Sequence, residues 1–364
     1  MMKRILAAMF LFAVAVSLHA QAVSATVCDI LKDPQGFNGK TVTIKGTVKI
    51  GLDEFVVVDA DCGLPVNAIW LAYPEGTNAK SGPLAMVELQ PASNFAGTVE
   101  EVQRAQVKLG WNKEFKQFDR LLSTQVKGGN MCLGCMKYEV AATLTGRLDG
   151  TRAEIKRDTG GKIVGISGFG NMNAYNARLV LGSVTDIVPH EIDYSKPAAN
   201  NGTPVQIPEE FTGVQPKDQL HRAHDSFGNQ GNNNGVVVGA VKNEVARKSE
   251  TRSDDKSPDG VIFNVEFNQD RLKGDDLSRA MAHVGEHIAD LRNPEAGIEQ
   301  ASVFQLEYRA WVTTAVFAIG SAQKSLTIPG GYEIWNSSWP QGDGVTNLEN
   351  AVSSYLQTEA GLTK

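Results

Sequence analysis

Two histidines four residues apart, His283 and His287, lie in the segment 275–290, which reads DDLSRAMAHVGEHIAD. Positions four apart in an α-helix lie on the same side, one turn from each other, so both imidazoles can face one ion. Glu307 follows His287 by twenty residues (307 − 287). Two histidines and one carboxylate are a common set of protein ligands for catalytic zinc, with a fourth position left to water. The spacing therefore predicts a zinc site made of His283, His287 and Glu307.

Two helices must position these side chains, and the sequence indicates both. Asp275 or Asp276 can begin the first helix, because a carboxylate caps free N–H groups and suits the positive end of the helix dipole. The range 301–319 is apolar nearly all round except for Glu307 and Arg309, which predicts a buried second helix. The apolar stripe of the first helix, at helical spacing, consists of Leu277, Met281, Val284, Ile288 and Leu291.

This pattern resembles the thermolysin-like branch of the zincin metallopeptidases, which carry H-E-x-x-H on one helix and a ligand glutamate on the next. The resemblance implies that His283, His287 and Glu307 are the zinc ligands and that a strand, predicted at 261–267, precedes the helix. One position departs from the family. Val284 stands where the family has its general base, and a valine cannot accept a proton.

Glu286 is the candidate for a substitute base, because it occupies the glutamate position of the inverted motif H-x-x-E-H. Inverted enzymes place their third ligand much further downstream than Glu307 lies here. The segment 283–290 is also similar to H-x-G-x-H-x-x-D segments of secreted bacterial proteins. The mixture indicates a degenerate metallopeptidase-like domain that has kept its metal ligands and lost hydrolysis.

Two classes of function stay open. The first is a zinc-dependent hydrolase that acts on peptides outside the cytoplasm. The second is a noncatalytic secreted protein that binds an unknown ligand, a peptide or a cell-surface partner, without a metal. In the second case the histidines are ordinary, partly buried residues bonded to carbonyls or to Asp290, and Glu307 pairs with Arg309 or with a histidine.

Short alternating stretches rich in β-branched residues dominate the first half of the chain. They predict strands at 41–48, 55–58, 68–71, 138–148, 162–166 and 178–184. Asn38-Gly39-Lys40 leads into a strand in which Gly46 predicts a bend. This opening resembles that of small OB-like barrels in secreted bacterial proteins, and Thr145-Gly146-Arg147 echoes it later. An immunoglobulin-like sandwich is the rival fold.

We therefore expect an α+β protein divided into four segments. They are a signal peptide at 1–22, an OB-like β-barrel domain at 23–193 with a large insertion at 76–134, a linker rich in Asn, Gly and Pro at 194–235, and a mainly helical, zincin-like domain at 236–364.

Three further segments are predicted as loops, at 169–175, 326–332 and 335–344. The first reads FGNMNAY and combines polar with aromatic residues. It is either a plain β-turn connection or the lip of a ligand site.

The N-terminus has the features of a secretory signal peptide. It begins with the basic pair Lys3-Arg4, continues with an apolar run at 5–18 and ends with the A-x-A site Ala20-Gln21-Ala22, so cleavage would leave Val23 as the first residue. The apolar run is too short to span a bilayer comfortably, and no other run is long and free of charge. We expect an exported protein, periplasmic or extracellular, without a membrane span.

Export places the four cysteines in an oxidising compartment, where an even number suggests disulfide bonds. We favour Cys28–Cys62 and Cys132–Cys135 among the three possible pairings. A redox role for Cys132-Leu133-Gly134-Cys135 and a zinc site made of cysteines are the alternatives. The net charge of −6 and the lack of a dense Lys/Arg stripe argue against a nucleic-acid partner.

Overall fold

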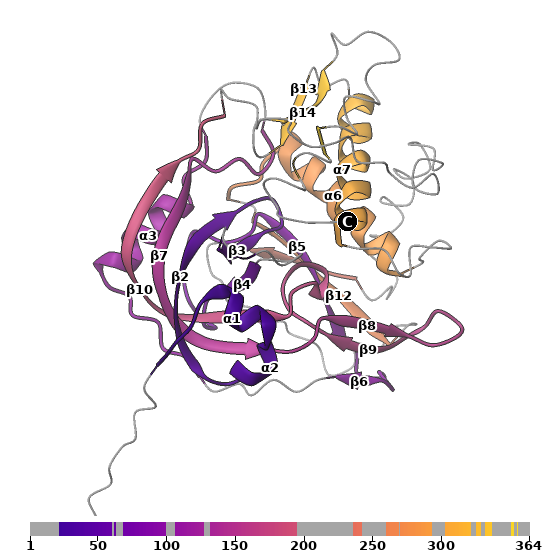
Figure 1. The fold of residues 1–364 in the computed structure, drawn as a ribbon. Coiled ribbons are helices and arrows are strands. Elements are labelled where there is room, and N and C mark those ends of the chain that lie inside the picture. Colours follow the sequence, from indigo (N-terminus) through magenta and orange to yellow (C-terminus); the bar gives the residue numbers. More distant parts are fainter. Residues whose placement is uncertain are drawn as a thin grey trace, which may run out of the picture.

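The computed structural model describes residues 22–59, 62, 68–99, 106–126, 132–194, 236–241, 260–268, 270–292, 303–321, 325–328, 332–336, 351–352 and 355. Within these ranges the protein combines helices and sheets, in agreement with the α+β prediction (Figure 1). The predicted signal peptide, apart from Ala22, and the predicted linker, apart from Tyr194, lie outside the described residues.

Five strands of the first half of the chain close into a barrel (Figure 1). They are β2 (Thr41–Ile50), β3 (Phe55–Val58), β4 (Ala68–Ala72), β7 (Tyr138–Gly150) and β10 (Ala177–Glu191). Their order around the barrel is β2-β3-β4-β10-β7, and β7 closes the ring by pairing with β2. Neighbours are antiparallel except β4 and β10, which run parallel. The predicted barrel is confirmed.

The predicted alternation sets the inside of the barrel, because successive side chains of a strand point to opposite faces. In β7 every second residue from Val140 to Leu148 is buried. Gly146 lies where β10 passes closely, and a Cβ atom there would be 2.2 Å from the Val180 carbonyl oxygen. The echo of the first strand's glycine therefore marks a place where two strands approach too closely for any side chain.

Short helices and one edge strand surround the barrel. They are β1 (Val23–Ser24), parallel to β2, and the helices α1 (Val27–Lys32), α2 (Pro34–Phe37) and α3 (Lys113–Leu122). Asn112 begins α3, since its side chain accepts a hydrogen bond from the Phe115 N–H. Phe115, Phe118 and Leu122 then lie on one face of α3 and join the barrel core.

A second sheet joins parts of the chain that are far apart in sequence. Its strands are β5 (Ala85–Pro91), β12 (Val261–Asn268) and β11 (Val236–Val241). β12 pairs antiparallel with β5 and parallel with β11. β5 belongs to the predicted insertion, and the sequence did not indicate this pairing, because a short buried strand carries no mark of its partner. The segment boundaries proposed from the sequence stay a prediction.

The helices predicted at 275–290 and 301–319 are present as α6 (Asp275–Arg292) and α7 (Val303–Gly320). They are followed by a hairpin of β13 (Ser325–Ile328) and β14 (Tyr332–Asn336). The prediction of loops at 326–332 and 335–344 was therefore wrong for the described residues, because these strands are too short to show a clear alternation. The C-terminal half mixes strands with helices, and its mainly helical character stays a prediction.

The connection between β7 and β10 has structure of its own. It contains β8 (Glu154–Arg157), β9 (Ile163–Ser167) and the 3-10 turn η1 (Asn171–Asn173). β9 also pairs in parallel with β6 (Thr98–Val99). The loop predicted at 169–175 thus lies at the end of this connection, around η1.

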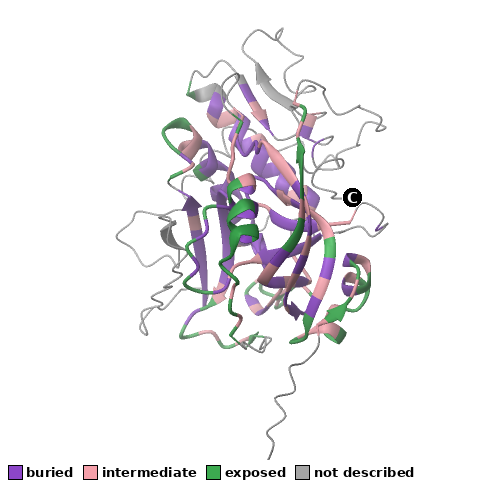
Figure 2. Ribbon diagram, turned by 90° about the vertical axis from the view of Figure 1, so that its left-hand side faces the viewer, coloured by how far each residue is buried: buried purple, intermediate pink, exposed green. Residues whose placement is uncertain are grey.

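Two apolar cores hold the described residues together. One fills the barrel, and the other lies between the second sheet, α6 and α7. In Figure 2 the buried residues run through the strands and helices at the centre of the molecule. Leu52, from the loop between β2 and β3, belongs to the second core. A loop of the barrel therefore reaches into the core that surrounds the two helices.

The cysteines form two pairs at disulfide distance, in agreement with the favoured pairing. Cys28 and Cys62 have their Cα atoms 5.4 Å apart, and Cys132 and Cys135 have theirs 5.5 Å apart. Among the described residues, no helix is both long enough and apolar enough to cross a membrane.

Candidate metal centre

Four buried side chains come together between the barrel and the two long helices. Asp53 lies in the loop between β2 and β3, His283 and His287 lie on α6, and Glu307 lies on α7. Each offers one ligand atom, and these atoms all lie within 4.8 Å of one another. None of the four residues is more than 7% exposed. We call this set the ligand group, and it is a group that can hold a metal ion.

Backbone hydrogen bonds fix the loop that carries Asp53. The carbonyl oxygen of Leu52 accepts from the N–H groups of Leu84 and Ala85, both at 2.7 Å. Ala85 begins β5, the strand that pairs with β12. The loop is thus attached to the second sheet as well as to the barrel, and this attachment holds Asp53 opposite α6.

Helix geometry places the two histidines side by side on α6. Their Nε2 atoms are 3.2 Å apart, and their rings are nearly perpendicular at 86°. The ring of His283 also packs against Trp311 of α7, with 4.5 Å between ring centres. Val284 and Ile288 of the same helix are buried in the second core. These buried residues of the predicted stripe hold the histidines against α7, whereas Met281, also predicted in the stripe, is exposed.

The distances within the ligand group match those around a four-coordinate ion. Asp53 Oδ2 lies 3.3 Å from His283 Nε2 and 3.5 Å from His287 Nε2. Glu307 approaches the same two nitrogens with Oε2 at 3.5 Å and Oε1 at 3.4 Å. Ligand atoms about 2.0–2.1 Å from a zinc ion are about 3.3–3.4 Å apart in a tetrahedron. The distances from the histidine nitrogens to the carboxylate oxygens are therefore close to those of a tetrahedral site, with a different Glu307 oxygen facing each nitrogen.

A hydrogen bond from α7 indicates which nitrogen of a neutral His283 carries the proton. Thr314 Oγ1 donates its hydrogen to the Ala310 carbonyl oxygen at 2.8 Å, so it accepts from His283 Nδ1 at 3.3 Å. A neutral imidazole has one N–H, so Nε2 of a neutral His283 carries a lone pair. That lone pair faces Asp53 and Glu307, and an ionised carboxylate cannot donate. His287 Nε2–H, 3.2 Å away, or a protonated Glu307 carboxyl can donate to this lone pair, and a bound cation would take the same position.

The two carboxyl groups respond to their shared site in opposite directions. Burial alone would raise the pKa of Asp53, but hydrogen bonds from His283 and His287 outweigh it and hold that pKa well below its usual range. Burial, and next the charge of Asp53, raise the pKa of Glu307 well above its usual range. Such a split is expected when two acids occupy one buried site. A divalent cation would favour the ionised form of both.

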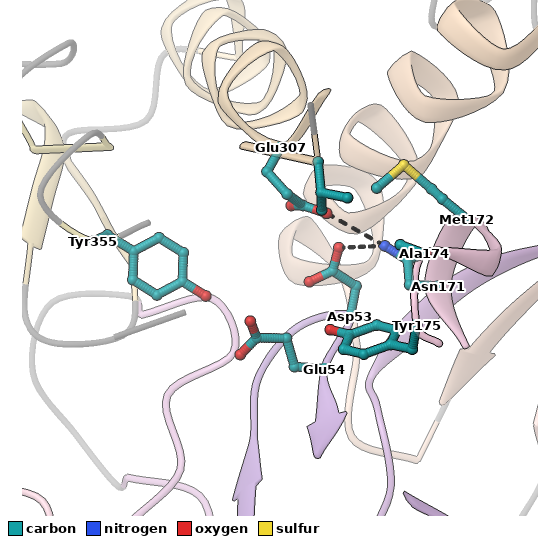
Figure 3. Close-up of a pocket in the computed structure, with 9 residues that line it drawn as sticks. Asp53, Glu54, Asn171, Met172, Ala174, Tyr175, Glu307 and Tyr355 are labelled. Carbon is teal, nitrogen blue, oxygen red and sulfur yellow. Dashed lines mark hydrogen bonds between the residues drawn. The ribbon is translucent and has the colours of Figure 1, made fainter. Parts of the chain in front are cut away.

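Asn171, the first residue of η1, contacts both carboxylates of the ligand group. Its Nδ2 atom lies 2.7 Å from Asp53 Oδ2 and 3.4 Å from Glu307 Oε1 (Figure 3). Its Oδ1 atom accepts from the Val87 N–H of β5 at 3.0 Å. Outer hydrogen bonds of this kind orient the ligands of metal sites. The loop predicted at 169–175 therefore lies directly beside the ligand group.

A pocket opens next to the ligand group (Figure 3). Its empty space, including space open to solvent, is ≈ 300 Å³. Two members of the ligand group, Asp53 and Glu307, line it directly, and this offers an ion a path between solvent and the ligand carboxylates. The lining residues are Asp53, Glu54, Asn171, Met172, Ala174, Tyr175, Val303, Glu307 and Tyr355.

Glu286, the predicted base, lies on α6 but outside the ligand group. Arg309 Nη2 donates to its Oε1 at 3.0 Å, and Thr313 Oγ1 donates to its Oε2 at 3.2 Å. Arg309 Nε also donates to Asp290 Oδ2 at 3.0 Å. Glu286, Asp290 and Arg309 are all buried. We call these three residues the arginine cluster.

The three ligands predicted from the sequence lie together, and two further residues join them. His283, His287 and Glu307 all belong to the ligand group, while their assignment as zinc ligands and that of Glu286 as a base stay predictions. Asp53 was missed, because an aspartate in a short turn between strands is common on any surface. Asn171 lies in a loop that the sequence singled out, but only the fold shows what it contacts.

Comparisons with protein-family models, with curated proteins and with solved structures found no match to this chain. The geometry of the ligand group is therefore the basis for its proposed chemistry.

Proposed function

We propose that the protein is an exported zinc-binding protein whose ligand group holds one ion without hydrolysing a substrate. One observation carries the proposal: two nitrogens and two carboxylates, all buried, lie within 4.8 Å of one another, with nitrogen-to-oxygen distances of 3.3–3.5 Å. The ligands come from a barrel loop, from α6 and from α7, so a bound ion would connect the barrel to the helix pair. The proposed role of the ion is to stabilise this junction.

Zinc is the ion that this donor set supports best. Zinc accepts imidazole nitrogen and carboxylate oxygen in a four-coordinate, tetrahedral arrangement. Calcium takes about six to eight oxygen ligands, and magnesium demands octahedral geometry with mostly oxygen ligands. Other first-row metals also bind imidazole, so the preference for zinc is part of what the experiments below measure.

Three features argue against hydrolysis. Asp53 supplies a fourth protein ligand, so no position remains for the water that a catalytic zinc activates. Val284 occupies the base position of the zincin pattern and is buried in the second core. Both carboxylate oxygens of Glu286 are bound, by Arg309 and Thr313. We therefore propose a structural role for Glu286 as well.

We further propose that the helix pair is a degenerate zincin-like unit and that the barrel is OB-like. The first is supported by two ligands at i and i+4 on α6 and a glutamate on α7. The second is supported by the strand order, by the parallel pair β4–β10 and by α3 between β4 and β7. OB-folds bind ligands at the loops after their first and fourth strands. Asp53 and Asn171 lie in the corresponding loops of this barrel.

A noncatalytic ligand-binding protein is the second candidate, and the pocket favours it. Tyr175, Tyr355 and Glu54 give the pocket aromatic and acidic walls (Figure 3). Burial and the nearby charges of Glu54 and Asp53 raise the pKa of Tyr175 well above its ordinary value, which keeps its hydroxyl protonated and able to donate a hydrogen bond. Such a pocket would take a small polar or cationic ligand.

The test is the metal content of the protein from the exported fraction, where its mass should correspond to a chain that begins at Val23. We expect about one zinc ion per chain, with nitrogen and oxygen ligands about 2.0–2.1 Å away by X-ray absorption. His283→Ala and His287→Ala should weaken zinc binding by more than about 100-fold, since loss of an outer partner alone costs about 10–100-fold. We expect no hydrolysis of peptides by the wild type.

His190→Ala is the matched control, because His190 is an exposed histidine of β10 outside the ligand group. It should bind zinc like the wild type. A wild type that binds no zinc at micromolar free ion, or a His190→Ala variant that loses zinc as the other two do, contradicts the proposal. The first of these results leaves the ligand-binding candidate.

A further inference from the structure

The segment around η1 contacts the second sheet through two asparagine side chains. Asn171 Oδ1 accepts from the Val87 N–H at 3.0 Å, and Asn173 Oδ1 accepts from the Leu89 N–H at 2.7 Å. Val87 and Leu89 are two residues apart in β5, so the two side chains bind the same edge of that strand, opposite the edge that pairs with β12. Both asparagines therefore serve the fold in the same way.

The turn between them has an unusual backbone. Met172 and Asn173 have φ angles of 54° and 55°, in the left-handed region that most residues avoid. Two such residues in succession bring both amide groups to one strand edge, and asparagine tolerates this conformation better than most residues do. The position of Asn171 is thus fixed by the turn and by β5 together.

Only Asn171 also reaches the ligand group. Since its Oδ1 atom is engaged by a backbone donor, the atom that faces the carboxylates is the NH₂ group. It has two hydrogens, and it lies 2.7 Å from Asp53 Oδ2 and 3.4 Å from Glu307 Oε1. Asn173 Nδ2 donates instead to the Leu89 carbonyl oxygen at 3.3 Å. The two residues share one structural contact and differ in their contact with the ligands.

We propose that Asn171 is a positioning residue that sets the metal preference of the ligand group, an inference that rests on the zinc-binding function proposed above. A carboxylate oxygen has two lone pairs, and the Asn171 NH₂ group occupies one on each carboxylate. The bonded oxygens are Asp53 Oδ2, which faces both histidine nitrogens, and Glu307 Oε1, which faces His287, so the amide holds one oxygen of each carboxylate toward the imidazoles. Two such oxygens and two imidazoles keep the coordination number at four, which suits zinc.

Cations that favour oxygen ligands need more oxygen atoms than the ligand group supplies through one oxygen of each carboxylate. Manganese(II), like calcium, prefers carboxylate and carbonyl ligands in a site of higher coordination number. At this site the extra oxygens would come from water or from carboxylates that turn to bind through both atoms. The amide of Asn171 opposes that rotation. Asn171 therefore favours zinc by restricting the geometry of its neighbours, without binding the ion.

The experiment compares Asn171→Asp with Asn173→Asp. Each variant is nearly isosteric and keeps an oxygen for the β5 N–H, while each loses its NH₂ group. Only Asn171→Asp places a third carboxylate beside the ligand group. Zinc affinity is measured by competition with a chromophoric chelator, and manganese affinity by the EPR signal of free manganese(II). Melting of the chelator-treated proteins reports the cost to the fold.

We expect Asn171→Asp to bind zinc roughly 10–100-fold more weakly and to bind manganese at least as tightly as the wild type, so that the zinc-to-manganese preference falls by a similar factor. Asn173→Asp should melt earlier but keep the wild-type preference. An unchanged preference in Asn171→Asp, or an equal shift in both variants, overturns the inference. A wild type that binds neither ion refutes the proposed function itself, so the two failures are distinguishable.

Discussion

The helix pair α6 and α7 buries carboxylates at two places, and the two places differ in the groups that face those carboxylates. In the arginine cluster the carboxylates of Glu286 and Asp290 are bound by the guanidinium of Arg309. In the ligand group the carboxylates of Asp53 and Glu307 face two imidazoles. Buried charge requires a partner of opposite sign. The first place has a permanent cation in the chain, and the second has only rings whose charge depends on protonation.

This difference shows which of two similar clusters is suited to a metal. A count of acidic and basic residues along α6 does not separate them, because Glu286 lies between the two histidines in the sequence. The contacts do separate them. The carboxylate that has an arginine is occupied by it, while the carboxylates without one converge on two Nε2 atoms.

Removing the permanent cation should have the largest effect. Arg309→Met would remove the guanidinium that binds the buried carboxylates of Glu286 and Asp290, and the loss of one member of a buried pair costs about 3–5 kcal/mol. We expect this loss in urea unfolding both with zinc and with a chelator. Arg309→Lys, which keeps the charge but not the forked geometry, should lose less. Wild-type stability of Arg309→Met would show that the arginine cluster does not depend on its cation.

Removing the metal should have a smaller effect, confined to proteins with an intact ligand group. At free zinc about 100-fold above the dissociation constant, the ion stabilises the folded state by about 2.7 kcal/mol. A chelator should therefore lower the melting temperature of the wild type and of His190→Ala. The melting temperature of His283→Ala should not respond. An equal response of all three proteins would mean that the chelator acts elsewhere.

Neutralising Glu286 should have the smallest effect. Glu286→Gln keeps the size of the side chain and loses one charge-assisted hydrogen bond to Arg309, which is worth about 1.5 kcal/mol. Zinc content should stay at the wild-type value, because Glu286 lies outside the ligand group. Loss of zinc in this variant would show that zinc binding depends on the arginine cluster as well, which contradicts the contrast drawn between the two clusters. If the wild type shows peptide hydrolysis and Glu286→Gln lacks it, the base role predicted from the sequence is supported instead.

Local patterns in the sequence were sufficient to predict the features that depend on residues close together in the chain. Helical spacing of apolar residues predicted α6, and a run that is apolar nearly all round predicted α7. Alternation of β-branched residues predicted the strands of the barrel. The histidine pair needed only the geometry of a single helix. Glu307 needed one further assumption, that consecutive helices pack together.

The features that the sequence did not reveal depend on contacts between segments that are far apart in the chain. Nothing near Asp53 distinguishes it from a solvent-exposed turn residue, because its burial comes from α6 and α7. The pairing of β5 with β12 was missed for the same reason. The function of Asn171 depends on both β5 and the ligand group, so no single stretch of sequence reveals it. Sequence patterns predicted the elements, while the site needed the arrangement of three separate elements.

The distance in sequence between the ligands has a consequence for how the protein folds. Asp53 and His283, which lie 3.3 Å apart, are separated by 230 residues. Contacts of such long range form slowly, because the intervening chain must be ordered first. A lone aspartate holds zinc poorly until the other three ligands are in place. Ion uptake would therefore be a late step that follows completion of both cores, so that the ion secures a finished structure and does not nucleate it.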